Sequence, residues 1–438
     1  MSQVRVGVAP RGALGESVLT AGFTREAGEM RCEGASLRTI AEAVGTPAYV
    51  YSAGAIREQY TRLHGAFARV DHRLHYSVKA NSSLAILAEL RKLGAGLDIV
   101  SGGELYRALK AGFRGEDVVF SGVGKDAQEL RDALDAKVLL INVESEEELV
   151  LLNAVAGSMG KRAPIALRVN PEVMVDTPHP YTRTGEKGMK FGIPFDETLR
   201  VAKAAIAFPN IDLIGLDMHV GSQISRFEPY ETGMSRLLSL LAEVAAAGAK
   251  IRYLDIGGGL AVTYEEENAV DVDEFASVVK KLLPDGIRLI MEPGRFLVGN
   301  SGVLLTRVLY RKRSGGKDFI ITDAGMNDLL RPSHYNAYHR IELVVPNGRE
   351  TVANVVGPVC ESGDFFALDR KMDDAMPGDL LAVQSAGAYG FVMASNYNSR
   401  RKPAEVLVDG DAFAVITERE DYSDLIRKET LEPKWRTD

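Results

Sequence analysis

The sequence predicts an α/β protein that combines a (β/α)8 barrel of the TIM type with a mainly antiparallel β domain. Two observations support this fold class. Eight short runs rich in β-branched residues alternate with amphipathic stretches between residues 75 and 295, which is typical of a parallel sheet. After about residue 300, the helical stretches give way to short apolar runs separated by turn residues, which favours antiparallel strands.

The chain of 438 residues is long enough for two domains. We expect the barrel to occupy residues 48–300 and the β domain to occupy residues 301–438, completed by residues 21–47. A hairpin-like piece at 22–33 precedes a short helix at 36–44. Residues 1–20 show little pattern and are expected to form a disordered extension.

The barrel strands are predicted at 75–80, 96–101, 118–122, 137–143, 165–170, 213–220, 253–259 and 289–295. Helix start signals lie between them, because Ser101 with Glu104 and Ser145 with Glu148 have the spacing of a capping box. Gly112 and Gly157 stand where helices would end.

Composition excludes several classes of partner. The chain has 52 basic and 60 acidic residues, a net charge of −8, and no polybasic run, so we expect no nucleic-acid or membrane partner. The two cysteines, Cys32 and Cys360, cannot form a disulfide framework, and neither lies in a zinc motif, so no metal is expected. No signal peptide or membrane span is apparent, and we expect a cytoplasmic protein.

Ionisable residues and glycines gather at the ends of the predicted strands, where barrel enzymes have their active sites. These residues are Lys79, Asp98, Asn142, Arg168, His219, Gly257, Gly258, Gly259, Glu292, Gly294 and Arg295.

Each of these side chains has a chemical and a structural interpretation. A desolvated Lys79 with a lowered pKa could form a Schiff base, or it could reach solvent or hold an ion pair. The glycines at 257–259 could bind a phosphate through backbone amides, or form a tight turn. Glu292 could keep a pyridine nitrogen protonated, or pair with Arg295 or Arg168. His219 could stack on a flat cofactor, or be an ordinary core histidine.

Five motifs together resemble a known family. They are HYSVKAN around Lys79, HVGSQ around His219, GGG at 257–259, EPGR at 292–295 and CESGD at 360–364. In order and spacing they are similar to the pyridoxal-phosphate-dependent decarboxylases of the alanine-racemase fold, which is the ornithine-decarboxylase-like fold type III. Within that family the full set is most similar to the diaminopimelate decarboxylases. The resemblance runs from about residue 23 to 410 and implies pyridoxal phosphate and a head-to-tail homodimer with active sites at the interface.

The resemblance also implies roles for individual residues. Lys79, His219 and Cys360 would be catalytic: Lys79 would bind the cofactor covalently, His219 would stack on its ring, and Cys360 of the partner subunit would return a proton. Glu292 would contact the pyridine nitrogen. The other cofactor positions are Ser222, Gly258, Gly259, Gly294, Arg295 and Tyr389, and the substrate positions are Arg295, Arg331, Tyr335, Glu361 and Tyr389.

The implied reaction is decarboxylation of meso-2,6-diaminopimelate to L-lysine and carbon dioxide, the last step of lysine biosynthesis. Its distal carboxylate calls for planar guanidinium groups such as Arg295 and Arg331, and Glu361 could take the distal ammonium. Arg331 and Tyr335 are four residues apart, so one helical turn would put them on one face. The structural alternatives are a solvated surface arginine at 331 and a small buried hydrophobe at Cys360.

Other functions stay open at this point. A decarboxylase of another basic amino acid, of the ornithine, lysine or arginine type, would not need Arg331 with Tyr335. An alanine racemase is disfavoured, because CESGD supplies Cys360 where that family is expected to use a tyrosine. A non-catalytic homologue that binds pyridoxal phosphate should have lost Lys79, Cys360 or a phosphate ligand, and all are present.

Overall fold

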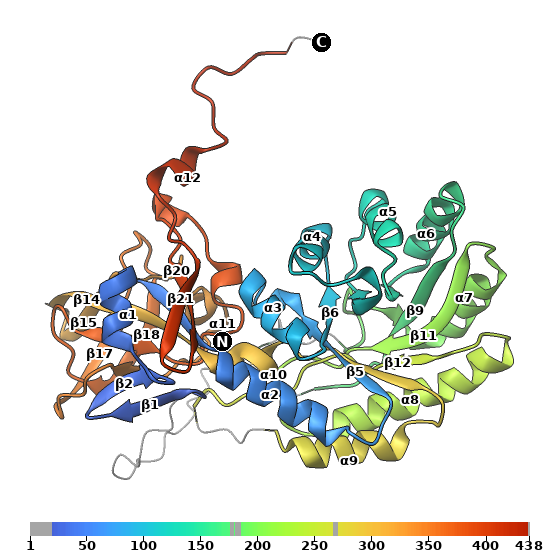
Figure 1. Cartoon of the computed structure of the whole chain (residues 1–438), viewed down its shortest axis with the longest axis horizontal. Coiled ribbons are helices and arrows are strands. Elements are labelled where there is room, and N and C mark those ends of the chain that lie inside the picture. The colour runs from blue at the N-terminus through green and yellow to red at the C-terminus, as the bar shows by residue number, and fades with distance from the viewer. Residues whose placement is uncertain (1–19, 176–178, 180–184, 266–269, 437–438) are drawn as a thin grey trace.

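The computed structural model describes residues 20–436, apart from 176–178, 180–184 and 266–269. These residues form a closed parallel barrel and a second, mostly antiparallel sheet, which lie side by side (Figure 1). The predicted extension at 1–20 falls outside the described residues, except for Thr20, which is buried.

Eight parallel strands close the barrel. They are β5 (His72–Ser77), β6 (Gly96–Ile99), β7 (Val118–Phe120), β8 (Leu140–Val143), β9 (Ala163–Asn170), β11 (Ile211–Met218), β12 (Tyr253–Asp255) and β13 (Arg288–Met291). Each strand pairs with the next, and β13 pairs with β5, which closes the sheet. All eight predicted strands are confirmed, although most end a few residues earlier than predicted. A short additional strand, β10 (Ile193–Pro194), pairs with β9.

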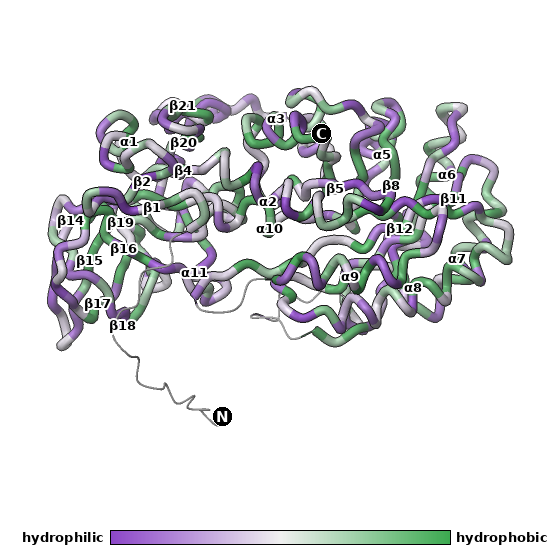
Figure 2. The backbone as a smooth tube through the Cα atoms, turned by 60° about the horizontal axis from the view of Figure 1, so that its bottom comes forward, coloured by the Kyte–Doolittle hydropathy of each residue, from purple (hydrophilic) through white to green (hydrophobic). Residues whose placement is uncertain are grey.

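Amphipathic helices surround the barrel (Figure 1). They are α2 (Ala53–Ala66), α3 (Leu84–Lys92), α4 (Gly102–Lys110), α5 (Ala127–Ala136), α6 (Glu146–Ser158), α7 (Phe195–Ala207), α8 (Glu228–Ala246) and α9 (Val272–Leu282). Hydrophobic and hydrophilic residues alternate along α8 and α9, as expected of helices with one face on the core (Figure 2). In the described part of the chain, no helix combines the length and the apolar character that crossing a membrane requires.

At the predicted start of α4, the serine cap is present but the full capping box is not. Ser101 Oγ accepts a hydrogen bond from the backbone N–H of Glu104, at 3.2 Å, but the Glu104 carboxylate accepts from Val100 N–H, at 2.7 Å, rather than completing a capping box. The prediction that Gly112 ends a helix is confirmed, because it follows the C-cap of α4 with φ at 88°. The prediction for Gly157 is wrong, because Gly157 lies inside α6. Gly160 has the left-handed conformation after that helix, with φ at 62°.

The second sheet is built mainly from the C-terminal part of the chain. Its strands are β4 (Ala48–Ser52), β14 (Gly302–Ser314), β15 (Lys317–Thr322), β16 (Ile341–Leu343), β17 (Glu350–Val356), β18 (Phe365–Asp373), β19 (Leu380–Val383), β20 (Ala404–Asp409) and β21 (Ala412–Thr417). Two pairings are parallel, β15 with β17 and β20 with β4, and the others are antiparallel. The short helices α11 (Arg331–Tyr335) and α12 (Tyr422–Ile426) belong to the same region.

The predicted start of the barrel segment at residue 48 is wrong, because β4 (Ala48–Ser52) belongs to the second sheet. It lies between β14 and β20 in the second sheet. A short apolar strand followed by a helix has the same local pattern in either sheet, so the sequence does not reveal which sheet it joins.

Residues 23–44 pack on the second sheet. The predicted hairpin is present as β1 (Phe23–Glu26) and β2 (Glu29–Cys32), and the predicted helix is α1 (Leu37–Val44). A two-residue strand, β3 (Ala35–Ser36), lies between β2 and α1 and pairs with β2. Leu37 and Ile40 of α1 share an apolar cluster with Val303 and Leu305.

One larger apolar cluster runs from the barrel into the second sheet. It contains Leu97 and Leu254 of the barrel together with Leu304 and Leu381 of β14 and β19. The shared core fixes the position of the second sheet relative to the barrel.

Candidate active site

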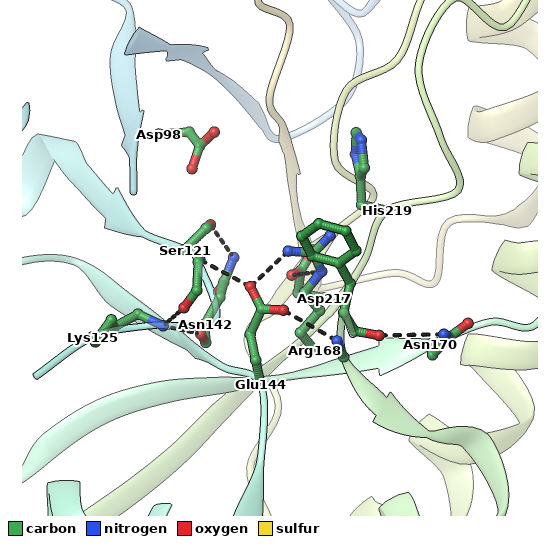
Figure 3. Close-up of polar contacts among 12 residues, drawn as sticks. Asp98, Ser121, Lys125, Asn142, Glu144, Arg168, Asn170, Asp217 and His219 are labelled. Atoms are coloured by element: carbon green, nitrogen blue, oxygen red, sulfur yellow. Dashed lines mark hydrogen bonds and ion pairs between the residues drawn. The ribbon is translucent and has the colours of Figure 1, made fainter. Parts of the chain in front are cut away.

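The carboxyl ends of the barrel strands bring predicted residues together, among them Asp98, Asn142, Arg168 and His219 (Figure 3). Lys79 lies in a single 3-10 turn, η1 (Val78–Ala80), directly after β5, while His219 follows β11 and Glu292 follows β13. The ammonium of Lys79 donates a hydrogen bond to Oδ2 of the buried Asp98, at 2.9 Å. The prediction that ionisable residues gather at this face of the barrel is confirmed.

The charge state of Lys79 differs from the prediction. Burial by itself would lower the pKa of Lys79, but the negative charges of Asp98 and Glu292 outweigh it and raise that pKa above its ordinary value. The predicted lowering is therefore wrong for the structure as it stands, and the ion pair is what forms. We call the face of the barrel at the carboxyl ends of its strands the mouth. The side chain of Lys79 remains 40% exposed at this mouth, so a ligand can reach it.

Glu292 is a buried carboxyl group with neutral hydrogen-bond donors. Ser121 Oγ donates to its Oε1 at 3.2 Å, and Asn142 Nδ2 donates in turn to Ser121 Oγ at 3.1 Å. Burial, followed by repulsion from Asp98, raises the pKa of Glu292 to about 7, against the opposing charges of Lys79 and Arg168. Glu292 can therefore hold or release a proton near neutral pH.

Two further buried carboxyl groups, those of Asp217 and Asp255, interact with Glu292. Burial raises the pKa of Asp217 and of Asp255 well above the ordinary value, and repulsion by Glu292 adds to the effect in both. Asp255 Oδ2 accepts a hydrogen bond from Asn142 Nδ2 at 3.5 Å. The three carboxyl groups of Glu292, Asp217 and Asp255 therefore cannot all be ionised together.

Arg168 is held by carboxylates other than Glu292 (Figure 3). Its Nη1 donates to Glu144 Oε1 at 2.7 Å, and its Nε lies 3.8 Å from Asp217 Oδ2. Glu144 also accepts from the backbone N–H of Gly122 and Gly192, at 2.9 and 3.1 Å, so it ties three strand ends together. Glu292 is thus left to the neutral donors Ser121 and Asn142, at 3.2 and 3.5 Å.

His219 is half-buried and neutral. Its Nδ1 accepts a hydrogen bond from the backbone N–H of Gly258, at 3.2 Å, which requires an unprotonated nitrogen. Burial, followed by the charges of Arg168 and Lys79, lowers the pKa of His219 well below its ordinary value. The ring is held at the mouth as a flat, uncharged surface (Figure 3).

The consecutive glycines are required by close packing. A Cβ at Gly258 would lie 2.1 Å from the carbonyl oxygen of Glu292, and a Cβ at Gly259 would lie 2.2 Å from that of Gly221. Gly259 also has φ at 104°, which side chains rarely adopt. The turn interpretation therefore accounts for these glycines, and their role as phosphate ligands stays a prediction.

Arg295 begins the short helix α10 (Arg295–Val298) and is 9% exposed. Its Nη1 donates to the hydroxyl of Tyr264 at 2.7 Å, its Nη2 donates to Ser222 Oγ at 3.2 Å, and its guanidinium lies 4.8 Å from the ring centre of Tyr389. Tyr389 is joined to the Lys79 turn, because its backbone N–H donates to the carbonyl of Ala80 at 2.8 Å. Among the described residues, the buried Nε of Arg295 finds no hydrogen-bond partner.

Arg331 is buried rather than a solvated surface arginine. It is 6% exposed, its guanidinium lies 5.0 Å from the ring centre of Tyr264, and its Nε donates to Nε2 of His339 at 3.3 Å. Tyr335 lies in the same turn of helix, as predicted, and its ring centre is 5.6 Å from that of His179.

Cys360 and Glu361 lie on the surface of the second sheet. Cys360 is exposed, which excludes the buried-hydrophobe alternative, and its backbone N–H donates to Asn398 Oδ1 at 2.8 Å. Glu361 accepts a hydrogen bond from Tyr397, and this bond raises the pKa of that tyrosine. Within a single chain, Cys360 and Glu361 thus contact residues of the second-sheet region and not Lys79.

Asp364, the last residue of the CESGD motif, fixes the loop that carries Cys360. Its carboxylate accepts from the backbone N–H of Met326 and of Val359, at 2.6 Å each. The loop is therefore presented in one conformation although Cys360 itself is exposed.

Sequence reasoning missed several residues of the mouth. Asp217 and Asp255 interrupt apolar strands, and these polar interruptions could have revealed them as inward-facing. Ser121 and Glu144 also lie at predicted strand ends. Tyr264 and His339 lie between regular elements, where no periodic pattern points to them.

Comparison with known proteins gives one consistent family. The model described as the pyridoxal binding domain of pyridoxal-dependent decarboxylases matches residues 53–299. The diaminopimelate decarboxylase of Aquifex aeolicus is 46% identical over 402 residues, which cover 91% of this chain and 95% of that protein. The one from Pseudomonas aeruginosa is 47% identical over 414 residues, with 94% and 99% covered. The crystal structure of diaminopimelate decarboxylase from Helicobacter pylori, complexed with L-lysine, superposes with a TM-score of 0.87 at 40% identity, covering 90% and 98%.

The residues of the mouth fit pyridoxal phosphate, the cofactor of this family. The buried Arg295 has an unmet donor at Nε, and its Nη2 contacts the Ser222 hydroxyl, a combination that suits a phosphate. The Glu292 carboxyl group, with its raised pKa, would suit a pyridine nitrogen, and the side chain of Lys79 would suit the carbonyl of the cofactor. The fold, the site and the sequence relatives agree, and the chain belongs to the diaminopimelate decarboxylase family of pyridoxal-dependent decarboxylases.

Proposed function

We propose that the protein decarboxylates meso-2,6-diaminopimelate to L-lysine and carbon dioxide, the reaction that completes lysine biosynthesis. The observation that carries the proposal is the pair of buried guanidinium groups of Arg295 and Arg331, which lie 5.9 and 5.0 Å from the ring centre of Tyr264. Within the described residues their hydrogen bonds go to neutral groups. Their positive charges are thus left for anions, which suits one cofactor phosphate and one substrate carboxylate.

The cofactor positions follow from the barrel mouth. Lys79 would hold pyridoxal phosphate, and His219 would lie against its ring. The cofactor supplies an electron sink for the carbon that loses carbon dioxide. Glu292 would keep a proton at the pyridine nitrogen, because its raised pKa lets it share one near neutral pH. The phosphate would be held by Ser222, Gly258, Gly259, Gly294, Arg295 and Tyr389.

The substrate positions involve both parts of the chain. Arg331, with Tyr335, Tyr389 and Arg295, would bind carboxylate, and the planar guanidinium of Arg331 suits a bidentate contact. Glu361 would take the distal ammonium. Cys360 would return a proton to the carbon that has lost carbon dioxide, because a thiol is a competent proton donor near neutral pH.

The location of Cys360 leads to a proposal about assembly. Because Cys360 and Glu361 are grouped with the second sheet of their own chain, they would act at the barrel mouth of a partner subunit in a homodimer. An exposed thiol that must stay reduced fits the cytoplasm, where we place the enzyme.

Subunit complementation tests the shared site. The variant Lys79→Ala should be inactive and Cys360→Ala should have about a hundredth of the parental activity or less, but a mixture dissociated and reassociated should recover up to about a quarter of it. Half of the dimers would then be mixed, and each would contain one intact site. Differently tagged chains verify the exchange. Verified exchange without recovered activity would contradict the shared site.

A substrate panel tests the reaction. The protein loaded with pyridoxal phosphate is incubated separately with meso-diaminopimelate, lysine, ornithine and arginine, and both carbon dioxide and amine products are measured. We expect carbon dioxide from diaminopimelate alone, with an equal amount of lysine. Release from ornithine, lysine or arginine instead would favour a decarboxylase of another basic amino acid. A bound cofactor without any release would indicate a non-catalytic homologue.

A further inference from the structure

His339 is a buried histidine with both ring nitrogens engaged. It is 0% exposed, its Nδ1 lies 2.8 Å from the carbonyl oxygen of Gln384, and its Nε2 lies 3.3 Å from Nε of Arg331. A carbonyl oxygen can only accept, so Nδ1 carries the proton and Nε2 is left as an acceptor. Gln384 therefore fixes the tautomer that Arg331 requires.

The imidazole of His339 stays neutral across the working range of an enzyme. Burial, followed by the charge of Arg331, lowers the pKa of His339 to about 3. A carboxylate in this place would neutralise Arg331 and compete with an anionic ligand. A neutral imidazole fixes the guanidinium and leaves its full positive charge available.

The contact to His339 determines which edge of Arg331 is left for a ligand. Because Nε is occupied, the two terminal nitrogens Nη1 and Nη2 remain as a parallel pair of donors. Tyr264 supports one face, at 5.0 Å from the guanidinium to the ring centre, and its own ring packs edge-on against His339, with centres 5.5 Å apart. The guanidinium plane is thus fixed from two sides.

We propose that His339 is a positioning residue for substrate recognition: it orients Arg331 so that Nη1 and Nη2 face the distal carboxylate of the substrate. It thereby favours ligands that carry this carboxylate over ligands that do not. This inference rests on the proposed function, because it assumes that Arg331 binds the substrate.

Two amide variants separate the two contacts of His339. In His339→Asn, the shorter side chain can still donate to the carbonyl of Gln384 but cannot reach Arg331. In His339→Gln, the longer side chain places an amide oxygen near the position of Nε2 and restores the acceptor. The Asn variant is the test and the Gln variant is the rescue.

The readout compares two ligands that differ in the distal carboxylate. L-lysine, the product, retains the carboxylate that is distal in diaminopimelate, whereas 1,5-diaminopentane has none. For His339→Asn we expect the inhibition constant of lysine and the KM of diaminopimelate to rise about tenfold or more, since a hydrogen bond to a charged group is lost. The inhibition constant of 1,5-diaminopentane, the cofactor content and kcat should change little, and His339→Gln should recover most of the loss.

A double-variant cycle tests whether the effect passes through Arg331. In an Arg331→Ala background, His339→Asn should raise the KM by no more than about twofold. His75→Asn is the matched control: His75 is equally buried and its Nδ1 lies 3.3 Å from the carbonyl of Leu97, so the change should lower stability without altering either inhibition constant.

The outcomes separate this inference from the proposed function. If Arg331→Ala raises the KM and His339→Asn does not, the inference is wrong and the proposed function stands. If His339→Asn weakens both inhibitors equally and His339→Gln gives no rescue, His339 is only structural and the inference is again wrong. If Arg331→Ala changes neither the KM nor the inhibition by lysine, the carboxylate receptor itself is overturned, and with it the proposed substrate.

Discussion

Nζ of Lys79 lies 2.9 Å from Oδ2 of Asp98, at the ends of two neighbouring barrel strands. Ser77 Oγ donates to the same carboxylate oxygen, at 2.7 Å. The ion pair holds Lys79 as an ammonium, which cannot act as a nucleophile. In its proposed role, Lys79 would have to lose this proton before it joins a cofactor carbonyl. We therefore expect Asp98 to influence the pH at which the protein takes up its cofactor.

Replacing Asp98 by Asn should shift cofactor uptake to lower pH. The change removes the largest influence that raises the pKa of Lys79, so a larger fraction of the amine is free at a given pH. The measurement is the rate at which the visible band of the bound cofactor appears when cofactor-free protein meets pyridoxal phosphate at a series of pH values. A parental pH profile in Asp98→Asn would show that Asp98 does not control the amine.

Replacing Cys360 by Ala should leave the cofactor bound and lower kcat by about 10²–10⁴-fold, the usual contribution of a positioned general acid. The visible band reports cofactor binding, and carbon dioxide release reports kcat. Cys32→Ala is a suitable control, because the Cys32 thiol is buried in the core beneath the second sheet. Parental turnover by Cys360→Ala would remove Cys360 from the mechanism.

Replacing Gly258 by Ala should destabilise the protein by about 1–3 kcal/mol, because the added methyl group overlaps backbone that cannot easily move. Its Cβ would lie 2.1 Å from the carbonyl oxygen of Glu292. Gly65→Ala is the control, since Gly65 lies in α2 with nothing within 4 Å of the added Cβ. That change should be neutral or stabilise by about 0.5–1 kcal/mol. The free energies of unfolding of both variants are measured with denaturant. If Gly258→Ala is as stable as Gly65→Ala, the close-packing argument is wrong.

Replacing Glu292 by Gln should flatten the pH dependence of stability in cofactor-free protein. The folded-state pKa of Glu292, about 7, lies above the ordinary value of 4.5, so the folded state retains a proton that the unfolded chain releases. The resulting stability is fully present below pH 4.5 and is lost as the pH rises to about 7.

Thermal melts between pH 5 and 7 measure this contribution of Glu292 to the pH dependence of stability. Glu58→Gln is the control, because Glu58 is exposed. The Tm of the parent should fall more steeply with pH than that of Glu292→Gln. Some dependence should remain, because burial also raises the pKa of Glu104 and of Asp328 to about 7. Parallel curves for parent and variant would mean that Glu292 titrates as an ordinary carboxyl group.

The barrel could be predicted from sequence because each strand and helix has its own local signal. Apolar runs mark the strands, and the rule that barrel chemistry lies at strand ends is enough to group Lys79, His219 and Glu292 from the sequence alone. Strand β4 shows the limit of this reasoning, since its residues predict a strand but not the sheet that it joins.

The electrostatics of the mouth could not be predicted in the same way. The pKa of Lys79 depends on Asp98 and Glu292, which come from other strands, so the direction of its shift is set by tertiary contacts. The proposed carboxylate receptor can be predicted only in part, because Arg331 follows from the family resemblance alone. His339 and Tyr264, which hold Arg331 in place, lie between regular elements, where no periodic pattern marks them.

The most direct test of the account follows cofactor and product in one cuvette. Cofactor-free protein is titrated with pyridoxal phosphate, and carbon dioxide release from meso-diaminopimelate is measured at each occupancy given by the visible band. The account predicts that release rises in proportion to the bound cofactor, and that Lys79→Ala shows neither the band nor release. A band in the parent without release from diaminopimelate, or turnover by Lys79→Ala at the parental rate, would contradict it.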